Sequence, residues 1–169
     1  MQVLVTFATK SGSATQIAEW IGEEISAAGH QVTVANVTQH PDPKAYDLVV
    51  AGSGVRAAGW EPEALNWLQT HQDVLQTKKI ALFNVGLMVL GDPKDPEKPV
   101  NWELINKYNN QVAEKFSLQP IASAAFPGWF IPEKFKFLER NILKMMKSPK
   151  GDFRDENQVR KWAAELVKQ

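Results

Sequence analysis

The sequence predicts an α/β fold, a doubly wound, five-stranded parallel sheet of order 2-1-3-4-5 with helices on both faces. Two observations predict this fold. Short apolar segments rich in β-branched residues alternate with segments whose apolar residues recur every three or four positions. The short segments are also nearly continuously apolar, which is typical of strands covered on both sides. With 169 residues, the chain is expected to form a single domain, 1–169.

The first elements make a βαβ unit. Residues 3–8 predict a strand, residues 14–28 predict a helix with isoleucines at helical spacing, and residues 31–37 predict a second strand. Gly29 follows the predicted helix, at the position where glycine often ends one in the left-handed conformation.

The alternation continues to the end of the chain. Pro62 suits the first position of a helix. An insert, 127–155, separates the fifth strand from the last helix and contains a predicted helix over 133–147. The remaining predictions are strands over 46–51, 79–85 and 120–126, and helices over 63–70, 101–116 and 156–167.

Composition excludes several classes of function. Acidic and basic residues balance at 19 each, so no net positive charge favours nucleic acid. The absence of cysteine excludes disulfides, thiolate nucleophiles and iron–sulfur ligation, so redox chemistry would need a bound cofactor. His30, His40 and His71 have no metal-ligand spacing and are expected at the surface, with no metal site. No leader and no apolar segment of spanning length is recognised, which predicts a cytoplasmic protein.

A run of small hydroxyl residues joins the first predicted strand to the first helix. Its backbone N–H groups and the helix N-terminus can bind an anion, and its hydroxyls can donate to phosphate oxygens. The alternative is an ordinary serine- and threonine-rich helix cap. The run lacks the glycine patterns of nucleoside triphosphatases and dinucleotide folds, and it suits one phosphate. It consists of Thr9, Lys10, Ser11, Gly12, Ser13, Ala14 and Thr15.

This run resembles the FMN-phosphate motif of flavodoxins. In order, that motif has a hydroxyl residue, any residue, Ser or Thr, Gly, any residue and Thr, and then an alanine after three further residues. The matching positions are Thr9, Ser11, Gly12 and Ala18. Ala14 stands where the family usually has a phosphate-binding threonine. Thr15 is adjacent and could replace that hydroxyl only if the register of the loop shifts.

Two further segments follow predicted strands and are expected at the same edge of the sheet. The resemblance implies that they border the flavin ring. Trp60 can stack on the ring or pack on the next helix, and Arg56 can lie near the ring or form a surface ion pair. Asn84 can instead cap a strand end, and Gly86 can mark a simple turn. The segments are Ser53, Gly54, Val55, Arg56 and Trp60, and Asn84, Val85, Gly86 and Leu87.

The insert contains a basic amphipathic segment over 133–150. Such a segment can lie on a membrane surface or meet an acidic partner; alternatively, its apolar side packs on the domain. The acidic residues are Glu133 and Glu139, and the basic residues are Lys134, Lys136, Arg140, Lys144, Lys147 and Lys150. The apolar residues near one side are Phe137, Leu138, Ile142, Met145 and Met146.

A flavodoxin-like body with this insert resembles the menaquinone-dependent protoporphyrinogen oxidase group. The resemblance extends over residues 34–37, 46–50, 53–56 and 137–146. It implies FMN as cofactor, a quinone or redox-protein partner, a porphyrinogen substrate, and a location at the inner face of the membrane. No side chain need be catalytic, because the flavin carries the chemistry.

Two other functions remain open at this stage. One is a flavodoxin-type electron carrier without its own substrate, which the neutral net charge disfavours because such carriers are usually acidic around the flavin. The other is a flavin-free binding module, which Ala14 in the phosphate motif suggests.

Overall fold

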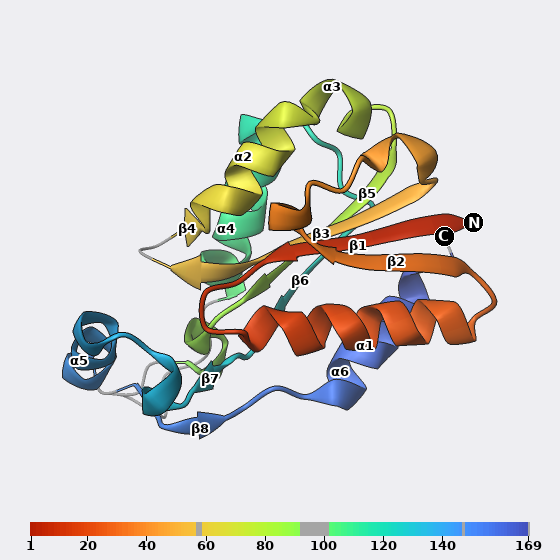
Figure 1. Cartoon of the computed structure of the whole chain (residues 1–169). Helices are drawn as coiled ribbons and strands as arrows, with labels where there is room; N and C mark the ends of the chain where they lie inside the picture. The colour runs from red at the N-terminus through yellow and green to blue at the C-terminus, as the bar shows by residue number, and fades with distance from the viewer. Residues whose placement is uncertain (57–58, 92–101, 147, 169) are drawn as a thin grey trace.

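The computed structural model describes residues 1–56, 59–91, 102–146 and 148–168 (Figure 1). Strands and helices alternate along the chain as predicted. The strands are β1 Gln2–Ala8, β2 Gln31–Asn36, β3 Leu48–Arg56, β4 Gly59–Trp60, β5 Lys79–Val85, β6 Ala122–Phe126, β7 Trp129–Phe130 and β8 Gly151–Asp152. The helices are α1 Ser13–Ala27, α2 Pro62–Thr70, α3 Gln72–Leu75, α4 Trp102–Lys115, α5 Phe137–Met145 and α6 Glu156–Leu166.

The main sheet is parallel, with the order β2-β1-β3-β5-β6. These are the five predicted strands in the predicted order 2-1-3-4-5, so this prediction is confirmed. Successive strands are added on one side of β1 as far as β2 and then on its other side from β3 onward, so the strand order reverses between β1 and β3. Ligands of such sheets bind near this point, outside the carboxyl ends of the strands.

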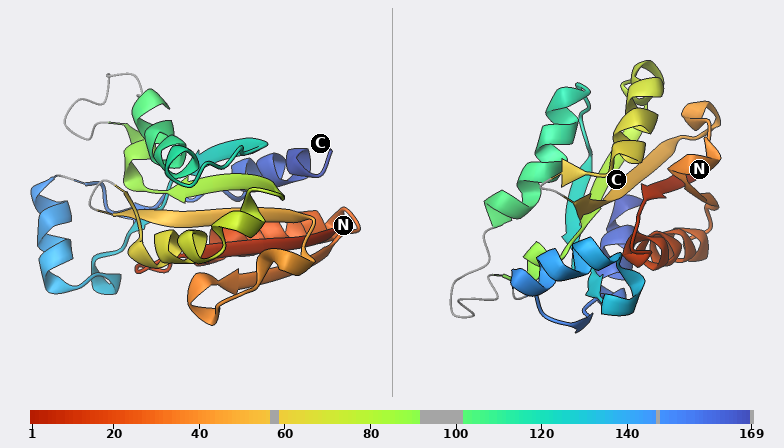
Figure 2. Two further views of the ribbon diagram at one scale, coloured as in Figure 1. Left: turned by 90° about the horizontal axis from the view of Figure 1, so that it is seen from above. Right: turned by 60° about the vertical axis from the view of Figure 1, so that its left-hand side comes forward.

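Helices cover both faces of the sheet (Figures 1 and 2), as predicted. Alternate residues of each strand point to opposite faces, which divides the core in two. One half is formed by Val3, Val5 and Phe7 of β1 with α1 and α6. The other half is formed by Leu4 and Ala8 with α2, α3 and α4.

Local signals at the helix ends agree with the sequence. Gly29 has φ of 88° after α1, the left-handed conformation that glycine adopts without steric cost. Pro62 occupies the first turn of α2, and the Asp155 side chain accepts a hydrogen bond from the Gln158 N–H at the start of α6.

Three details differ from the predictions. The third strand extends to Arg56 and pairs with the short antiparallel β4, so residues 52–56 are strand and not loop. The insert contains the two-stranded ribbon β7–β8, which the sequence did not predict. The helix predicted over 133–147 begins only at Phe137, because Pro132 starts a separate 3-10 turn and Phe135 then returns to an extended conformation. Residue 147 lies outside the described residues.

The insert extends beyond the carboxyl ends of the strands, at the end of the molecule opposite to both chain termini (Figures 1 and 2). The T-shaped contact between the rings of Phe130 and Phe135, 5.5 Å between centroids, packs β7 on the segment before α5. Within the described ranges, no helix has the length and apolar character needed to span a membrane.

Candidate functional site

The three predicted segments meet at one edge of the sheet. In the parallel register, Ala8 of β1 pairs with Ser53 of β3, and Ser53 pairs with Asn84 of β5. The segments that follow these residues therefore leave the sheet side by side, as the topology predicted.

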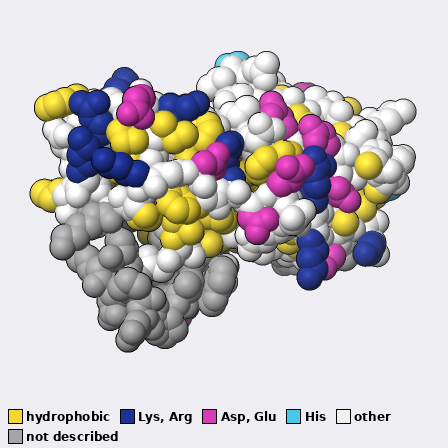
Figure 3. Space-filling model, turned by 90° about the horizontal axis from the view of Figure 1, so that it is seen from below, with side chains coloured by type: hydrophobic (Ala, Val, Ile, Leu, Met, Phe, Trp, Pro, Cys, Tyr) yellow, Lys and Arg dark blue, Asp and Glu magenta, His cyan; other side chains and the backbone are white. Residues whose placement is uncertain are grey.

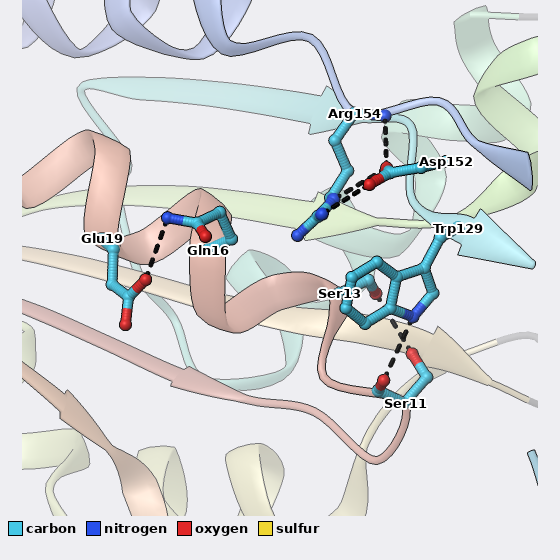
Figure 4. A network of polar contacts seen from close by, with 7 residues as sticks. All are labelled: Ser11, Ser13, Gln16, Glu19, Trp129, Asp152 and Arg154. Carbon is cyan, nitrogen blue, oxygen red and sulfur yellow. Dashed lines mark hydrogen bonds and ion pairs between the residues drawn. The ribbon is translucent and has the colours of Figure 1, made fainter. Parts of the chain in front are cut away.

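The hydroxyl loop after β1 forms a tight turn around Gly12 (Figure 4). Gly12 has φ of 85°, a conformation that only glycine adopts routinely. Its N–H donates to Thr9 Oγ1 at 3.1 Å, and the Oγ atoms of Ser11 and Ser13 lie 3.2 Å apart. Two serine hydroxyls therefore gather at the point where α1 begins, beside the exposed Lys10.

The start of α1 is suited to an anion. Gly12 is the N-cap, no side chain caps the helix there, and its first turn contains no acidic residue. A helix of 15 residues presents free N–H groups and a partial positive charge at this end. The loop thus offers backbone amides, the Ser11 hydroxyl and a neighbouring lysine to a phosphate-sized group, which fits the phosphate of FMN. The Ser13 hydroxyl lies 3.2 Å from that of Ser11, although Ser13 is only 6% exposed.

The other two residues of the run do not add hydroxyls to this cluster. Ala14 is fully buried and packs in the core on the α1 and α6 side of the sheet. Thr15 lines a shallow cavity between α1 and the end of β2, together with Phe7 and Asn36. The shift in loop register that would let Thr15 replace the missing threonine is therefore not seen.

The segment after β3 is held by internal hydrogen bonds. Ser53 is fully buried; its Oγ donates to the Gly54 carbonyl at 2.8 Å and accepts from the Glu61 N–H at 2.9 Å. The Ser53 side chain thus ties the end of β3 to the residue before α2 and does not face a ligand, whereas Gly54 and Val55 are partly exposed and can border one.

Of the two interpretations of Trp60, the structure supports packing. Trp60 is only 5% exposed and lies in the core near α2, with its Nε1 donating to Asn109 Oδ1 of α4 at 3.2 Å. The same Asn109 Oδ1 accepts from the fully buried Asn84 Nδ2, and the Asn109 Nδ2 group donates to the Ala124 carbonyl of β6. These side chains therefore fix the base of the site and do not face its opening.

Arg56 forms the surface ion pair that was one of its two predicted roles. Its guanidinium pairs with Glu139, which links the end of β3 to α5 of the insert. After β5, the N–H of Gly86 donates to the Phe126 carbonyl at 3.0 Å. Val85 is buried, whereas Gly86 and Leu87 are partly exposed at the edge of the sheet.

Glu61 is a residue that the sequence analysis missed. It is 4% exposed, and its Oε2 has no hydrogen-bond partner among the described residues. Burial raises the pKa of this carboxyl, and the nearby charges of Lys10 and Arg56 oppose the rise. Its position directly before Pro62, where an N-terminal cap is expected, gave no signal that the side chain is buried at the edge of the candidate site.

Trp129 was also missed, although the sequence shows it in an aromatic Pro-Gly turn after the fifth strand. Its indole lies beside the hydroxyl loop, and Nε1 donates to the Ser11 carbonyl at 3.1 Å (Figure 4). Two cations lie over its ring: Arg154 at 4.1 Å and Lys134 at 4.3 Å from the centroid.

Helix α5 turns its apolar side to solvent, so the expectation that this side packs on the domain is wrong. Phe137 and Leu138 are each 70% exposed and Met145 is 76% exposed, and Ile142 and Met146 are also exposed. Basic side chains lie beside this apolar surface at one end of the molecule (Figure 3).

The described residues include no cluster of three or more potential metal-ligating side chains. His40 is exposed, and His71 is half-buried against Trp67, where burial lowers the pKa of its ring. Of the three histidines expected at the surface, His40 is exposed, whereas His30 and His71 are only partly exposed.

Comparison with known proteins agrees with the fold and site. A model of the flavodoxin domain family matches residues 4–157. Protoporphyrinogen IX dehydrogenase [quinone] of Escherichia coli K12 is 25% identical over 153 residues, covering 89% of this chain and 81% of the relative.

Solved structures of similar fold include flavodoxins. Oxidised flavodoxin 1 of Bacillus cereus has a TM-score of 0.63 at 14% identity, covering 100% of this chain and 99% of its own. Two-electron reduced flavodoxin of Megasphaera elsdenii has the same TM-score and identity, covering 99% of each chain. At these identities the likeness shows the fold alone.

Proposed function

This chain belongs to the flavodoxin domain family, and we propose that it is an FMN-dependent oxidoreductase that takes electrons from a porphyrinogen and passes them to a quinone. The observation that supports this proposal best is the loop between β1 and α1, which offers an uncapped helix N-terminus and the Ser11 hydroxyl to one phosphate. The second support is the likeness to a quinone-linked dehydrogenase along most of the chain.

In this proposal the phosphate is held by Thr9, Ser11, Gly12 and Ser13, with Lys10 contributing positive charge. The flavin ring would be bordered by the backbone of Gly54 and Val55 and by that of Gly86 and Leu87, which neighbouring strands bring to one edge. Bound FMN would accept electrons from the reduced substrate and deliver them to the acceptor. The side chains of this chain bind and orient the cofactor, and none serves as nucleophile or metal ligand.

We extend the proposal to the location of the acceptor. Quinones with long apolar chains reside in the lipid bilayer, and α5 has the features of a helix that lies on a membrane surface, an exposed apolar side beside basic residues. The Arg56–Glu139 ion pair connects α5 to the edge of the site. Binding of α5 to the inner face of a membrane would therefore bring the flavin close to its quinone.

The absorption spectrum of the purified chain, recorded with and without added FMN, tests the cofactor. The proposal predicts a bound flavin band, and turnover when a porphyrinogen and a menaquinone analogue are supplied together. Bound FMN without turnover with any of several quinones would favour an electron carrier. No bound flavin under either condition would favour a binding module and contradict the proposal.

Sedimentation with lipid vesicles tests the membrane contact. We expect binding to vesicles that contain anionic lipid, and a loss of more than about tenfold when Phe137 and Met145 are both changed to serine, since burying each apolar side chain stabilises binding by about 1.5–3 kcal/mol. Val34→Thr on β2 removes an exposed apolar group elsewhere and serves as control. Equal binding by all three proteins would contradict a role for α5.

A further inference from the structure

The insert contacts the rest of the molecule at the hydroxyl loop as well as through the Arg56–Glu139 ion pair. Trp129 donates to the Ser11 carbonyl, and a Cβ at Gly12 would lie only 3.3 Å from Cζ2 of the indole. One residue earlier, a Cβ at Gly128 would lie 3.4 Å from Ser13 Oγ and 3.3 Å from Val85 Cγ1. Trp129 therefore bonds to the loop at Ser11, its indole lies beside Gly12, and the Gly128 backbone lies beside Ser13.

Trp129 and Thr9 together fix the orientation of one peptide group, the one that joins Ser11 to Gly12. The Gly12 N–H donates to Thr9 Oγ1, and the Ser11 carbonyl of the same peptide accepts from Trp129 Nε1, each at 3.1 Å. Because a trans peptide directs its N–H and C=O in opposite directions, these two bonds together fix the orientation of its plane. A carbonyl that turned toward a bound phosphate would repel it, so this orientation matters for an anion site.

The indole itself is held by residues that follow the two strands of the insert ribbon. Trp129 pairs with Asp152 across β7 and β8, and Asp152 accepts two hydrogen bonds from the Arg154 guanidinium. That guanidinium lies over the Trp129 ring, as does Lys134 Nζ. Cations over an indole face stabilise its position, more so where water is partly excluded. Figure 4 shows the hydrogen bonds between Arg154 and Asp152 and between Trp129 and Ser11.

We propose that Trp129 is a positioning residue through which the docked insert holds the loop in the conformation that binds the flavin phosphate. The inference rests on the proposed function, because it concerns the same phosphate. By linkage, phosphate binding and docking of the insert then favour each other. The proposal assigns the insert a second task, independent of any membrane contact by α5.

The test compares two ligands that differ only in the phosphate. FMN and riboflavin are titrated into the wild-type chain and into Trp129→Phe, which keeps an aromatic ring and loses the N–H donor. Loss of one such hydrogen bond corresponds to a fall in FMN affinity of about two- to tenfold. Riboflavin affinity should change by less than about twofold, because riboflavin has no phosphate for the loop to bind. Trp129→Ala should reduce FMN affinity further.

Trp20→Phe is the matched control, because the Trp20 ring also lies near Arg154, at 5.7 Å, but packs against the core on the α1 and α6 side of the sheet. It should leave both affinities unchanged. A second readout is proteolysis of the insert, which FMN should slow in the wild type but not in Trp129→Ala. Equal FMN affinity in the wild type and both Trp129 variants would overturn the inference while leaving the proposed function intact. If the wild type fails to bind FMN, both are overturned.

Discussion

Replacement of Gly12 by alanine tests whether the left-handed turn after β1 shapes the phosphate site. An L-residue in this conformation costs about 1–2 kcal/mol. The new Cβ would also lie 3.3 Å from the Trp129 indole, which is tighter than ordinary contact. If the indole and loop move apart by a few tenths of an ångström, the crowding adds about 1 kcal/mol.

Gly29→Ala provides a matched control at the other end of the same helix. Gly29 has φ of 88°, close to the 85° of Gly12, but a Cβ there would meet nothing within 4 Å. The two variants thus share the backbone strain and differ in the contact with Trp129 and in their distance from the site.

Thermal unfolding and FMN titration measure the two effects separately. For a chain of this size, 1 kcal/mol corresponds to a shift of about 2–4 °C, so Gly29→Ala should lower the unfolding temperature by about 2–8 °C and Gly12→Ala by about 4–12 °C. FMN affinity should fall at least about tenfold in Gly12→Ala only, as for the loss of one hydrogen bond to a charged phosphate. Equal FMN affinities in the two variants would refute the reasoning.

Three further predictions concern the core, the buried Glu61 and the half-buried His71. Gly52→Ala should lower the unfolding temperature by about 2–12 °C, since its Cβ would lie about 2 Å from the buried Phe83 ring, while Gly59→Ala, with open space, should match the wild type. Burial raises the pKa of the Glu61 carboxyl in the folded state, so the stability that Glu61 contributes is present below its unfolded pKa and lost as pH rises through its folded pKa. Glu61→Gln should therefore raise the unfolding temperature at pH 7 and raise it less near pH 4. A constant difference across pH would contradict that assignment. Burial lowers the pKa of the His71 ring, so the stability that His71 contributes is present above about pH 6.5 and lost as pH falls through its folded pKa. His71→Gln should therefore flatten the decline in unfolding temperature below about pH 6.5. An unchanged decline would count against this assignment.

The strand order and the helix positions could be predicted because they depend on local patterns. Apolar runs with β-branched residues identify strands, and Gly29 and Pro62 mark helix boundaries. The parallel topology then places the ends of β1, β3 and β5 at one edge, which is why the three predicted segments meet there.

Side-chain roles at this edge were harder to predict because they depend on contacts distant in sequence. Trp60 and Asn84 are both joined to Asn109, a residue 49 positions from one and 25 from the other. Trp129 reaches a carbonyl 118 positions away. No periodicity encodes such pairs, so the packing of Trp60 and the contact of the insert with the loop emerged only from the three-dimensional structure.

Of the two alternatives for the insert helix, the one in which its apolar side packs on the domain is wrong. Its apolar spacing is the same whether the apolar side faces a core or a membrane, and the sequence pattern alone cannot separate the two. The structure decides this through the exposure of Phe137, Leu138 and Met145.

The central claim is that the loop between β1 and α1 binds the phosphate of FMN. Parallel titration of the flavin-free chain with FMN and with riboflavin, followed by the quenching of flavin fluorescence, tests it most directly. The account predicts that FMN binds at least about tenfold more tightly than riboflavin, as expected for a hydrogen-bonded phosphate. Equal affinities for the two flavins, or no binding of either, would contradict it.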